Sequence, residues 1–375
     1  MFIPLHCPNS QCAHFSPPDC PDWYRYFGTY TTKTSGEVPR YRCRACRKTF
    51  SSMSFSIDYF SKKHLPMEQI YNQLNGGLGI RKIARNLHVH HNTIRNRIDR
   101  MARNAILIHQ QVLTTLPFKE DFVADGFESF CVSQYFPDNY HLLIGKDSQF
   151  VYTADYVSLR RKGRMREEQR IKRSELENLW RVPKGSLQRS FGGMCEWLEM
   201  RTRMRDRPLI LYTDEKKEYG RALKQNRVCQ EHLRQGRWIH HRTSSRAVRS
   251  LWNPLFAVNY IDREIRKDMA AHVRETVQFN RSVNDGMIRM SLYLFDHNYR
   301  KPFRVRDKEK KKLTHVEVAG ADRGMVELLA ASFFERRYFG KKGQMPEGPS
   351  RKSLVRGWET PLHGTGRPPS KHLAA

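Results

Sequence analysis

The sequence predicts a multidomain α/β protein, and three observations support this fold class. Paired cysteines near the N-terminus indicate a small module stabilised by a metal, and the following segment has apolar residues at helical spacing. Beyond Pro117, strand patterns alternate with helical ones, as in a mixed sheet flanked by helices. At 375 residues the chain is long enough for two or three domains. We therefore expect a zinc ribbon, a helix-turn-helix, an α/β domain and a basic C-terminal tail.

The charge of the chain favours a polyanionic partner. Lys and Arg number 67 against 38 Asp and Glu, which gives a formal net charge of +29 and a pI near 10.0. Such an excess is typical of nucleic-acid binding, and we prefer it to a ribosome-like role or an anionic membrane surface. The N-terminus lacks the pattern of a signal peptide, and no apolar run reaches about 20 residues. We expect a soluble, cytoplasmic, nucleoid-associated protein with no membrane partner, whose cysteines are thiols or metal ligands.

Two pairs of cysteines in residues 1–55 predict a zinc ribbon. Cys7 and Cys12 form the first pair, and Cys43 and Cys46 form the second, in a turn surrounded by basic and aromatic residues. Zinc prefers four soft ligands in a tetrahedron, and two short turns can supply them. The other possible ligands in this module are Cys20 in place of Cys12, His6 and His14. The alternative is that the four cysteines are unrelated buried thiols.

Residues 60–112 predict three short helices, of which the last two have helix-turn-helix spacing. Gly76-Gly77 separates the first helix from the second, and residues 88–90 form the turn before the third. Arg pairs with guanine and Asn with adenine in the major groove. We expect the third helix to present five base-reading side chains outward, namely Asn92, Thr93, Arg95, Asn96 and Arg97. The alternative is a helical hairpin with a solvated basic face.

Residues 118–303 predict the α/β domain. We expect strands over 122–130, 131–135, 140–144, 150–157, 209–213 and 238–241. We expect helices over 215–224, 259–276 and 283–297. A basic region lies between the strand expected over 150–157 and the strand expected over 209–213. Its part over 175–203 is expected to be helical, with interruptions at 183–185 and 192–193.

The remainder, residues 304–375, is predicted to be a basic extension. A charge run over 304–312 is typical of a linker, and residues 325–338 can form one more helix. The last 30 or so residues are rich in Gly, Pro, Lys and Arg, which indicates poor order.

Three aspartates are placed where metal-dependent phosphoryl chemistry would need them. Asp125 follows an apolar run, Asp214 follows residues 209–213, and Asp262 lies at the start of a helical segment behind Asn259. Each alone is more often a cap or a surface charge, and Asp214 suits a helix N-cap. Together, carboxylates repel unless a cation joins them, and they could bind two Mg²⁺ ions about 3.5–4 Å apart.

Taken together, these segments resemble insertion-sequence DNA transposases that carry an N-terminal zinc ribbon, a helix-turn-helix and an acidic-triad catalytic domain of ribonuclease H-like fold. The resemblance extends over roughly four fifths of the chain, from Cys7 to Pro302. It is carried by residues 42–51, 78–103, the surroundings of Asp125 and Asp214, the spacing from Asn259 to Asp262, and residues 274–279 and 297–302.

The resemblance implies the roles of the acidic residues. Asp125 and Asp214 would be the first two ligands of Mg²⁺ or Mn²⁺, and Asp262 the third. The family usually has Glu at the third position, so Glu264 is the alternative ligand. Two residues along a helix turn a side chain by about 200°, so Asp262 and Glu264 cannot both face the metals unless the helix begins between them. The basic segment 160–205 has no clear counterpart, and it could grip DNA.

The function implied is that of a transposase. Such a protein binds the terminal inverted repeats of its mobile element and catalyses Mg²⁺-dependent DNA cleavage and strand transfer into double-stranded target DNA. We expect a homo-oligomer, because two ends must be held together. One alternative is a domesticated or inactive transposase-derived regulator that only binds DNA. Another is a ribonuclease H-like nuclease that cuts without joining strands.

Overall fold

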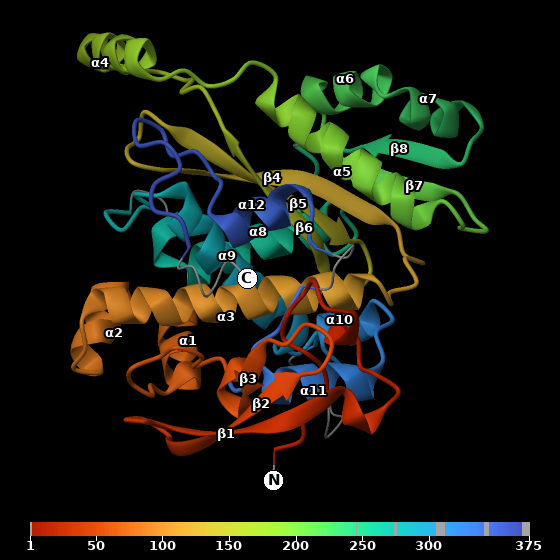
Figure 1. Ribbon diagram of the computed structural model, residues 1–375. Coiled ribbons are helices and arrows are strands. Elements are labelled where there is room, and N and C mark those ends of the chain that lie inside the picture. Colours follow the sequence, from red (N-terminus) through yellow and green to blue (C-terminus); the bar gives the residue numbers. More distant parts are fainter. Residues whose placement is uncertain (1, 245, 274–275, 305–311, 341–344, 370–375) are drawn as a thin grey trace.

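The computed structural model describes residues 2–244, 246–273, 276–304, 312–340 and 345–369, and it has three levels (Figure 1). A small sheet near the N-terminus lies at one end, a long helix crosses the middle, and a larger sheet with its helices occupies the other end. Within the described residues, no helix is both long and apolar enough to span a membrane.

The N-terminal level is a three-stranded antiparallel sheet in the order β1-β2-β3. Its strands are β1 (Tyr24–Thr32), β2 (Gly36–Cys43) and β3 (Thr49–Ser51), and its short 3₁₀ helices are η1 (Ala13–Phe15), η2 (Pro21–Trp23) and η3 (Ser52–Phe55). The core of this level is small: Trp23 stacks on Phe50 with ring centroids 5.4 Å apart, next to the buried cysteines. A core this small explains why the segment has so many cysteines, since modules of this size usually need a metal or a disulfide.

The middle level contains the three expected helices, α1 (Met67–Asn75), α2 (Ile80–Asn86) and α3 (His91–Leu113). Gly77 ends the first of them with φ +84°, a conformation that glycine adopts without strain. Ile94 and Ile98 of α3 are buried, as its apolar spacing predicts. The helix then continues through its buried second half, packed against α9 (Val283–Tyr299).

The larger sheet is mixed, as predicted, and has the order β6-β5-β4-β7-β8. Its strands are β4 (Phe122–Phe130), β5 (Pro137–Gly145), β6 (Val151–Ser158), β7 (Leu209–Thr213) and β8 (Trp238–Arg242). The pairs β4–β5 and β5–β6 are antiparallel, whereas β4–β7 and β7–β8 are parallel. The separate strand expected over 131–135 is wrong. Phe130 pairs directly with Pro137, so the residues between them form the tight connection, with Val132 at φ 67°.

Helices cover both faces of this sheet. They are α5 (Ser186–Thr202), α6 (Lys217–Gln225), α7 (Arg227–Arg234), α8 (Phe256–Asp268) and the short η4 (Ala270–His272), in addition to α9. Helix α4 (Glu167–Leu179) buries no residue and extends away from the sheet (Figure 1). One core joins β4, β5 and β7 to α5 and α6, and a second core joins the opposite face to α8 and α9. Apolar residues of the strands therefore face a core on each side of the sheet.

Three helix predictions need correction. The break expected at Gly192-Gly193 is wrong, because α5 runs through both glycines and buries Phe191, Met194 and Leu198 on either side of them. Packing of that face outweighs the low helix propensity of glycine. The helix expected to extend to residue 276 ends at Asp268, where the backbone leaves the helical region at Met269. Helix α7 was not predicted at all.

The C-terminal part is more ordered than the composition suggests. It contains α10 (His315–Val318), α11 (Arg323–Ser332) and α12 (Gly348–Val355). The expected poor order is wrong for residues 345–369, since Trp358 is only 4% exposed and packs against Tyr156 of β6. Asn284 of α9 donates to its carbonyl at 2.8 Å and accepts from its N–H at 3.1 Å. Most of the predicted linker 304–312 and the final residues 370–375 lie outside the described residues.

Candidate functional site

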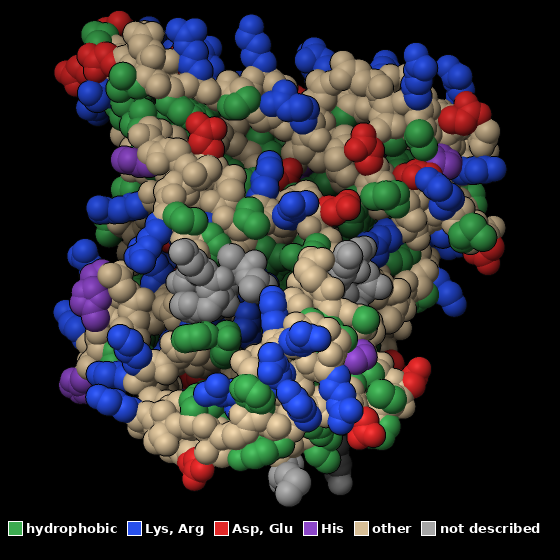
Figure 2. Space-filling model, viewed as in Figure 1, with side chains coloured by type: hydrophobic (Ala, Val, Ile, Leu, Met, Phe, Trp, Pro, Cys, Tyr) green, Lys and Arg blue, Asp and Glu red, His purple; other side chains and the backbone are tan. Residues whose placement is uncertain are grey.

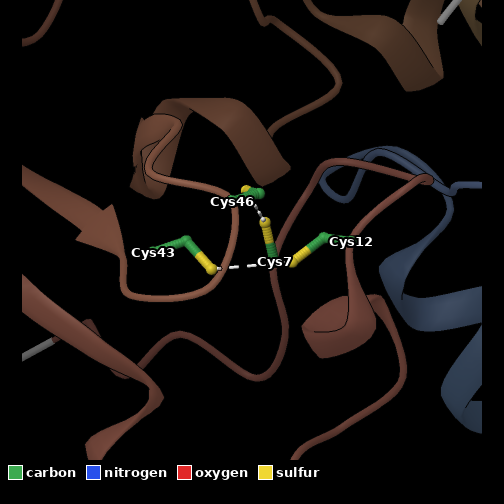
Figure 3. Close-up of side chains that lie close together, drawn as sticks. All are labelled: Cys7, Cys12, Cys43 and Cys46. Carbon is green, nitrogen blue, oxygen red and sulfur yellow. Dashed lines mark hydrogen bonds between the residues drawn. The ribbon is translucent and has the colours of Figure 1, made fainter.

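The four predicted cysteines meet at one point (Figure 3). Their Sγ atoms all lie within 4.8 Å of one another, with 3.6 Å between Cys7 and Cys46 and 3.6 Å between Cys12 and Cys43. Cys43 ends β2 and Cys46 lies in the turn to β3, so the small sheet places the second pair. In the described ranges this is the only group of three or more potential ligands gathered so closely. The four cysteines could hold a structural metal such as zinc.

The surroundings of the cluster separate its members from the other candidates. Cys20 is exposed and outside the group, and His6, which contacts the carbonyl of Cys7, is not a member of the group either. His14 lies beside the cluster, with Nδ1 3.6 Å from Cys43 Sγ, but is not a member of it. Burial raises the pKa of the Cys46 thiol, but the N–H of Lys48 and the Asn9 side chain outweigh it and bring the pKa to about 7. Burial instead raises the pKa of Cys7 and of Cys12, so the thiolate, which is the form that binds a metal, is favoured at Cys46 and not at these two.

A second site forms where β4 and β7 lie side by side. Ala124 pairs with Thr213 in the parallel ladder, so the next residues are neighbours on adjacent strands, Asp125 within β4 and Asp214 just beyond the end of β7. The ammonium of Lys216 lies between them, with Nζ 2.8 Å from Asp125 Oδ1 and 3.3 Å from Asp214 Oδ2. Tyr219 also donates to Asp125 Oδ1 at 3.2 Å. The two carboxylates therefore share one positive charge.

Asp262 of α8 completes the surroundings of this site. Side chains alternate across a strand, so Asp125 faces the same side as Val123 and Phe127, which pack in the core that contains α8. Burial, and then the negative charge of Asp125, raise the pKa of Asp262 to about 7. Its Oδ1 atom is buried and has no hydrogen-bond partner in the described part of the chain. Burial and Asp125 also raise the pKa of Asp214. The three acids thus interact electrostatically.

The three acids do not, however, form a closed ligand set. Their oxygens are not among the groups of ligand atoms that all lie within 4.8 Å in the described residues. The position of Lys216 explains this, since its ammonium separates Asp125 from Asp214 where a metal ion would join them. The arrangement is an acidic pair neutralised by an internal cation, with a third acid close by.

Glu264, the alternative third acid, belongs to a different cluster. It is 6% exposed and accepts hydrogen bonds from Lys301 and from Lys267, the latter at 3.3 Å. Burial raises its pKa, but these two lysines lower the pKa by more. Two residues along α8, the side chain has turned to the other side of the helix, as its period requires. Asp262 is therefore the acid that interacts electrostatically with Asp125, whereas Glu264 is paired with lysines.

The residues proposed to read bases differ in how far they are exposed to solvent. Asn92 and Arg95 are exposed, while Thr93 and Asn96 are partly buried. The expected outward position of Arg97 is wrong: it is 4% exposed and donates to the carbonyl of Lys63 at 2.6 Å and to Asn96 Oδ1 at 2.9 Å. Position 97 lies three residues after Ile94 on the buried stripe of α3, so its guanidinium stabilises the fold.

Lys216 and Tyr219 were missed by the sequence reasoning, although their spacing contains a signal. Lys216 follows Asp214 by two residues, and Tyr219 lies three residues further, one turn along α6. Lys and Arg side chains are also spread widely over the face shown in Figure 2, at both ends of the molecule. A basic surface of this kind is suited to a polyanionic partner.

No protein-family model matches this chain, and a search among curated proteins finds no match. The interpretation of the two sites therefore depends on their geometry and on the sequence resemblance described above.

Proposed function

We propose that the protein is a DNA transposase whose catalytic domain, residues 118–303, is ribonuclease H-like. The observation that carries this proposal is the convergence of Asp125 and Asp214, from adjacent parallel strands, with Asp262 from the helix packed on them. The mixed sheet with helices on both faces is compatible with such a domain. The four-cysteine cluster, the three helices before the sheet and the net charge of +29 add support.

The acidic site fits a divalent cation such as Mg²⁺ or Mn²⁺. Lys216 shows that the Asp125–Asp214 pair attracts positive charge, and the buried Oδ1 of Asp262 lacks a partner in the described residues. Asp125, Asp214 and Asp262 would hold the metal, and Lys216 would withdraw from at least one carboxylate. Bound Mg²⁺ supplies activation of a water or 3′-hydroxyl and stabilisation of the leaving oxygen. The chain positions the phosphate against these acids.

The zinc ribbon and the helix-turn-helix would bind the terminal inverted repeats. Asn92 and Arg95, at the exposed start of α3, are suited to reading bases in the major groove. Arg95 also forms an ion pair with Asp285 of α9 at 3.2 Å, so it must leave this partner when it reaches a base. Because two element ends must be held together, we propose that the active form is a homo-oligomer.

A cleavage assay on a duplex that contains an element end tests the proposal. Asp214→Asn should abolish Mg²⁺-dependent nicking while end binding, measured by fluorescence anisotropy, stays within about twofold of wild type. Glu264→Gln is the matched control, because this buried acid pairs with lysines outside the site, and it should still cleave. Mg²⁺-dependent nicking that persists in Asp214→Asn would refute the assigned role.

One observation favours a second candidate, a transposase-derived regulator that binds DNA without cutting it. Lys216 already neutralises the acidic pair, and the three acids are not closed into one ligand set. This candidate predicts end binding with no cleavage in either Mg²⁺ or Mn²⁺. Strand joining in the same assay separates the transposase from a nuclease, which would cut only.

A further inference from the structure

The loop between β8 and α8 presents exposed apolar side chains beside the acidic site. Trp252 is 92% exposed, Val248 83% and Leu251 74%. Burying such side chains is favourable, so a cluster of them on a surface indicates a contact with another molecule. Two arginines in the same loop, Arg246 and Arg249, are also exposed.

The ends of this loop fix its position relative to the acids. At its start, the N–H of Thr243 donates to the carbonyl of Thr213 at 2.9 Å, and Thr213 directly precedes Asp214. At its end, the chain enters α8, which carries Asp262. Arg249 is close enough to Asp262 to offset part of the rise in pKa that burial and Asp125 cause. The loop therefore lies next to the acidic site, because one of its ends is hydrogen-bonded beside Asp214 and the other leads into the helix that carries Asp262.

The loop is also held in shape by its own hydrogen bonds. Asn253 is 8% exposed; its side chain donates to the carbonyl of Val248 at 2.7 Å and accepts from the N–H of Leu255 at 2.8 Å. Its own N–H donates to the carbonyl of Ser250 at 3.1 Å. Trp252, the residue before this buried anchor, thus projects from an ordered turn.

The chemistry of the loop identifies its partner as a nucleic-acid strand. An indole presents a π face on which a base can stack, and Arg249 and Arg246, which precede Trp252 in the same loop, suit the phosphates next to that base. A base inside a duplex has both faces covered by its neighbours, so away from the duplex ends only a base that is unpaired and has left the stack can stack on Trp252. The acidic site beside the loop would act on the same backbone.

We propose that residues 246–252 form a strand-binding loop in which Trp252 stacks on an unpaired base of the substrate strand and Arg246 and Arg249 contact the phosphates nearby. This inference rests on the proposed function, because it places the strand along Asp125 and Asp214. It deepens that function by specifying the substrate as DNA that is unpaired at the reacting position.

Binding without metal tests the loop separately from catalysis. The probes are a 20-nucleotide single strand of arbitrary sequence and the same sequence as a perfect duplex, both in EDTA. Trp252→Ala should weaken binding of the single strand by about 5- to 150-fold, the range expected for one lost stacked base, and leave duplex binding unchanged. Trp252→Phe should retain most of the affinity. Met204→Ala is the control, because Met204 is 94% exposed and lies outside the loop.

A second readout reports stacking directly. A duplex with one unpaired 2-aminopurine should lose fluorescence when wild-type protein or Trp252→Phe binds, and keep its fluorescence with Trp252→Ala. Equal weakening on single strand and duplex, no weakening at all, or loss of binding to anionic vesicles instead of DNA would overturn the inference. If cleavage requires Asp214 but Trp252→Ala changes neither strand binding nor fluorescence, only the proposed strand-binding loop is refuted. If the fluorescence change is seen but no cleavage occurs, only the catalytic proposal is refuted.

Discussion

Lys216 offers the sharpest test of the acidic site, because the structure predicts opposite effects of its removal with and without metal. Lys216→Met keeps the length and apolar stem of the side chain but removes the charge between Asp125 and Asp214. Without metal, the two carboxylates then repel each other, and the variant should be less stable than wild type. With Mg²⁺, the same variant should bind the ion more tightly, because no internal cation competes for the pair.

The distances set the magnitude of the first effect. At an effective dielectric constant of about 20, unit charges separated by the observed 2.8 Å and 3.3 Å attract by about 5–6 kcal/mol each, before desolvation. Desolvation offsets most of this attraction, and measured losses are about 1 kcal/mol for exposed pairs and about 3–5 kcal/mol for buried ones. The Lys216 side chain is 28% exposed. We therefore expect the free energy of unfolding in EDTA to fall by about 2–3 kcal/mol.

The second effect follows from linkage between binding and folding. If the Kd for Mg²⁺ decreases from about 1 mM to about 0.1 mM, the stabilisation by about 10 mM Mg²⁺ rises from about 1.4 to about 2.7 kcal/mol. Denaturant unfolding with and without Mg²⁺, together with calorimetric titration of the ion, measures both effects. Lys217→Met is the matched control, because Lys217 is the exposed neighbour, and it should change neither. A Lys216→Met variant with unchanged or weaker Mg²⁺ affinity would refute the competition between the ammonium and the metal.

Three further predictions concern the fold and the cysteine cluster. Burial raises the pKa of Asp138 to about 8, so this carboxyl takes up a proton on folding at pH values between its unfolded and folded pKa. As the pH rises from about 4 to about 8, the free energy of unfolding should therefore fall by up to about 1.4 kcal/mol per pH unit. Asp138→Asn should remove that slope in denaturant titrations, and an unchanged slope would contradict the prediction. Trp358→Ala should cost about 3–5 kcal/mol of unfolding free energy, whereas the exposed Trp252→Ala should cost almost none, and equal losses would show that the C-terminal segment is not packed as described. Cys43→Ser should abolish the zinc content measured by mass spectrometry and Cys20→Ser should leave it intact; the reverse result would reassign the cluster.

The sequence predicted most of the larger sheet because its strands contain short apolar runs, such as residues 122–124 and 209–212. Residues 122–130 and 209–213 coincide with β4 and β7, whose apolar residues pack into the cores on both faces of the sheet. The errors arose where tertiary packing overrides local preference. The glycines at 192 and 193 remain helical because α5 is held against the sheet, and Trp358 orders a segment whose composition indicates disorder.

At the candidate site, the sequence placed Asp125 within the strand over 122–130 and Asp214 directly after the strand over 209–213, but it could not predict their partner. The register between β4 and β7 puts them side by side, and only that register brings Lys216 between them. The choice between Asp262 and Glu264 depended on the phase of α8, which begins at Phe256 and not between the two acids. Arg97 was misplaced because a basic residue on an amphipathic helix is usually solvated, whereas here it is buried and donates to the carbonyl of Lys63 and to the side chain of Asn96.

The position of α3 bears on how DNA binding and catalysis could be coupled. Its first turn holds Asn92 and Arg95 at the surface, while its second half is buried against α9. One hydrophobic core includes Ile94 of this helix together with Phe122 and Leu211 of the larger sheet. A helix that continues into the core cannot swing freely, because any rotation would expose apolar surface. DNA held by the first turn of α3 would therefore meet the acidic site at a fixed offset. Selection of the reacting phosphate would then depend on the number of base pairs between the repeat sequence and the cleavage position. Inserting two base pairs at that junction should therefore shift the nick by two nucleotides relative to the element end, or abolish nicking, while binding is retained.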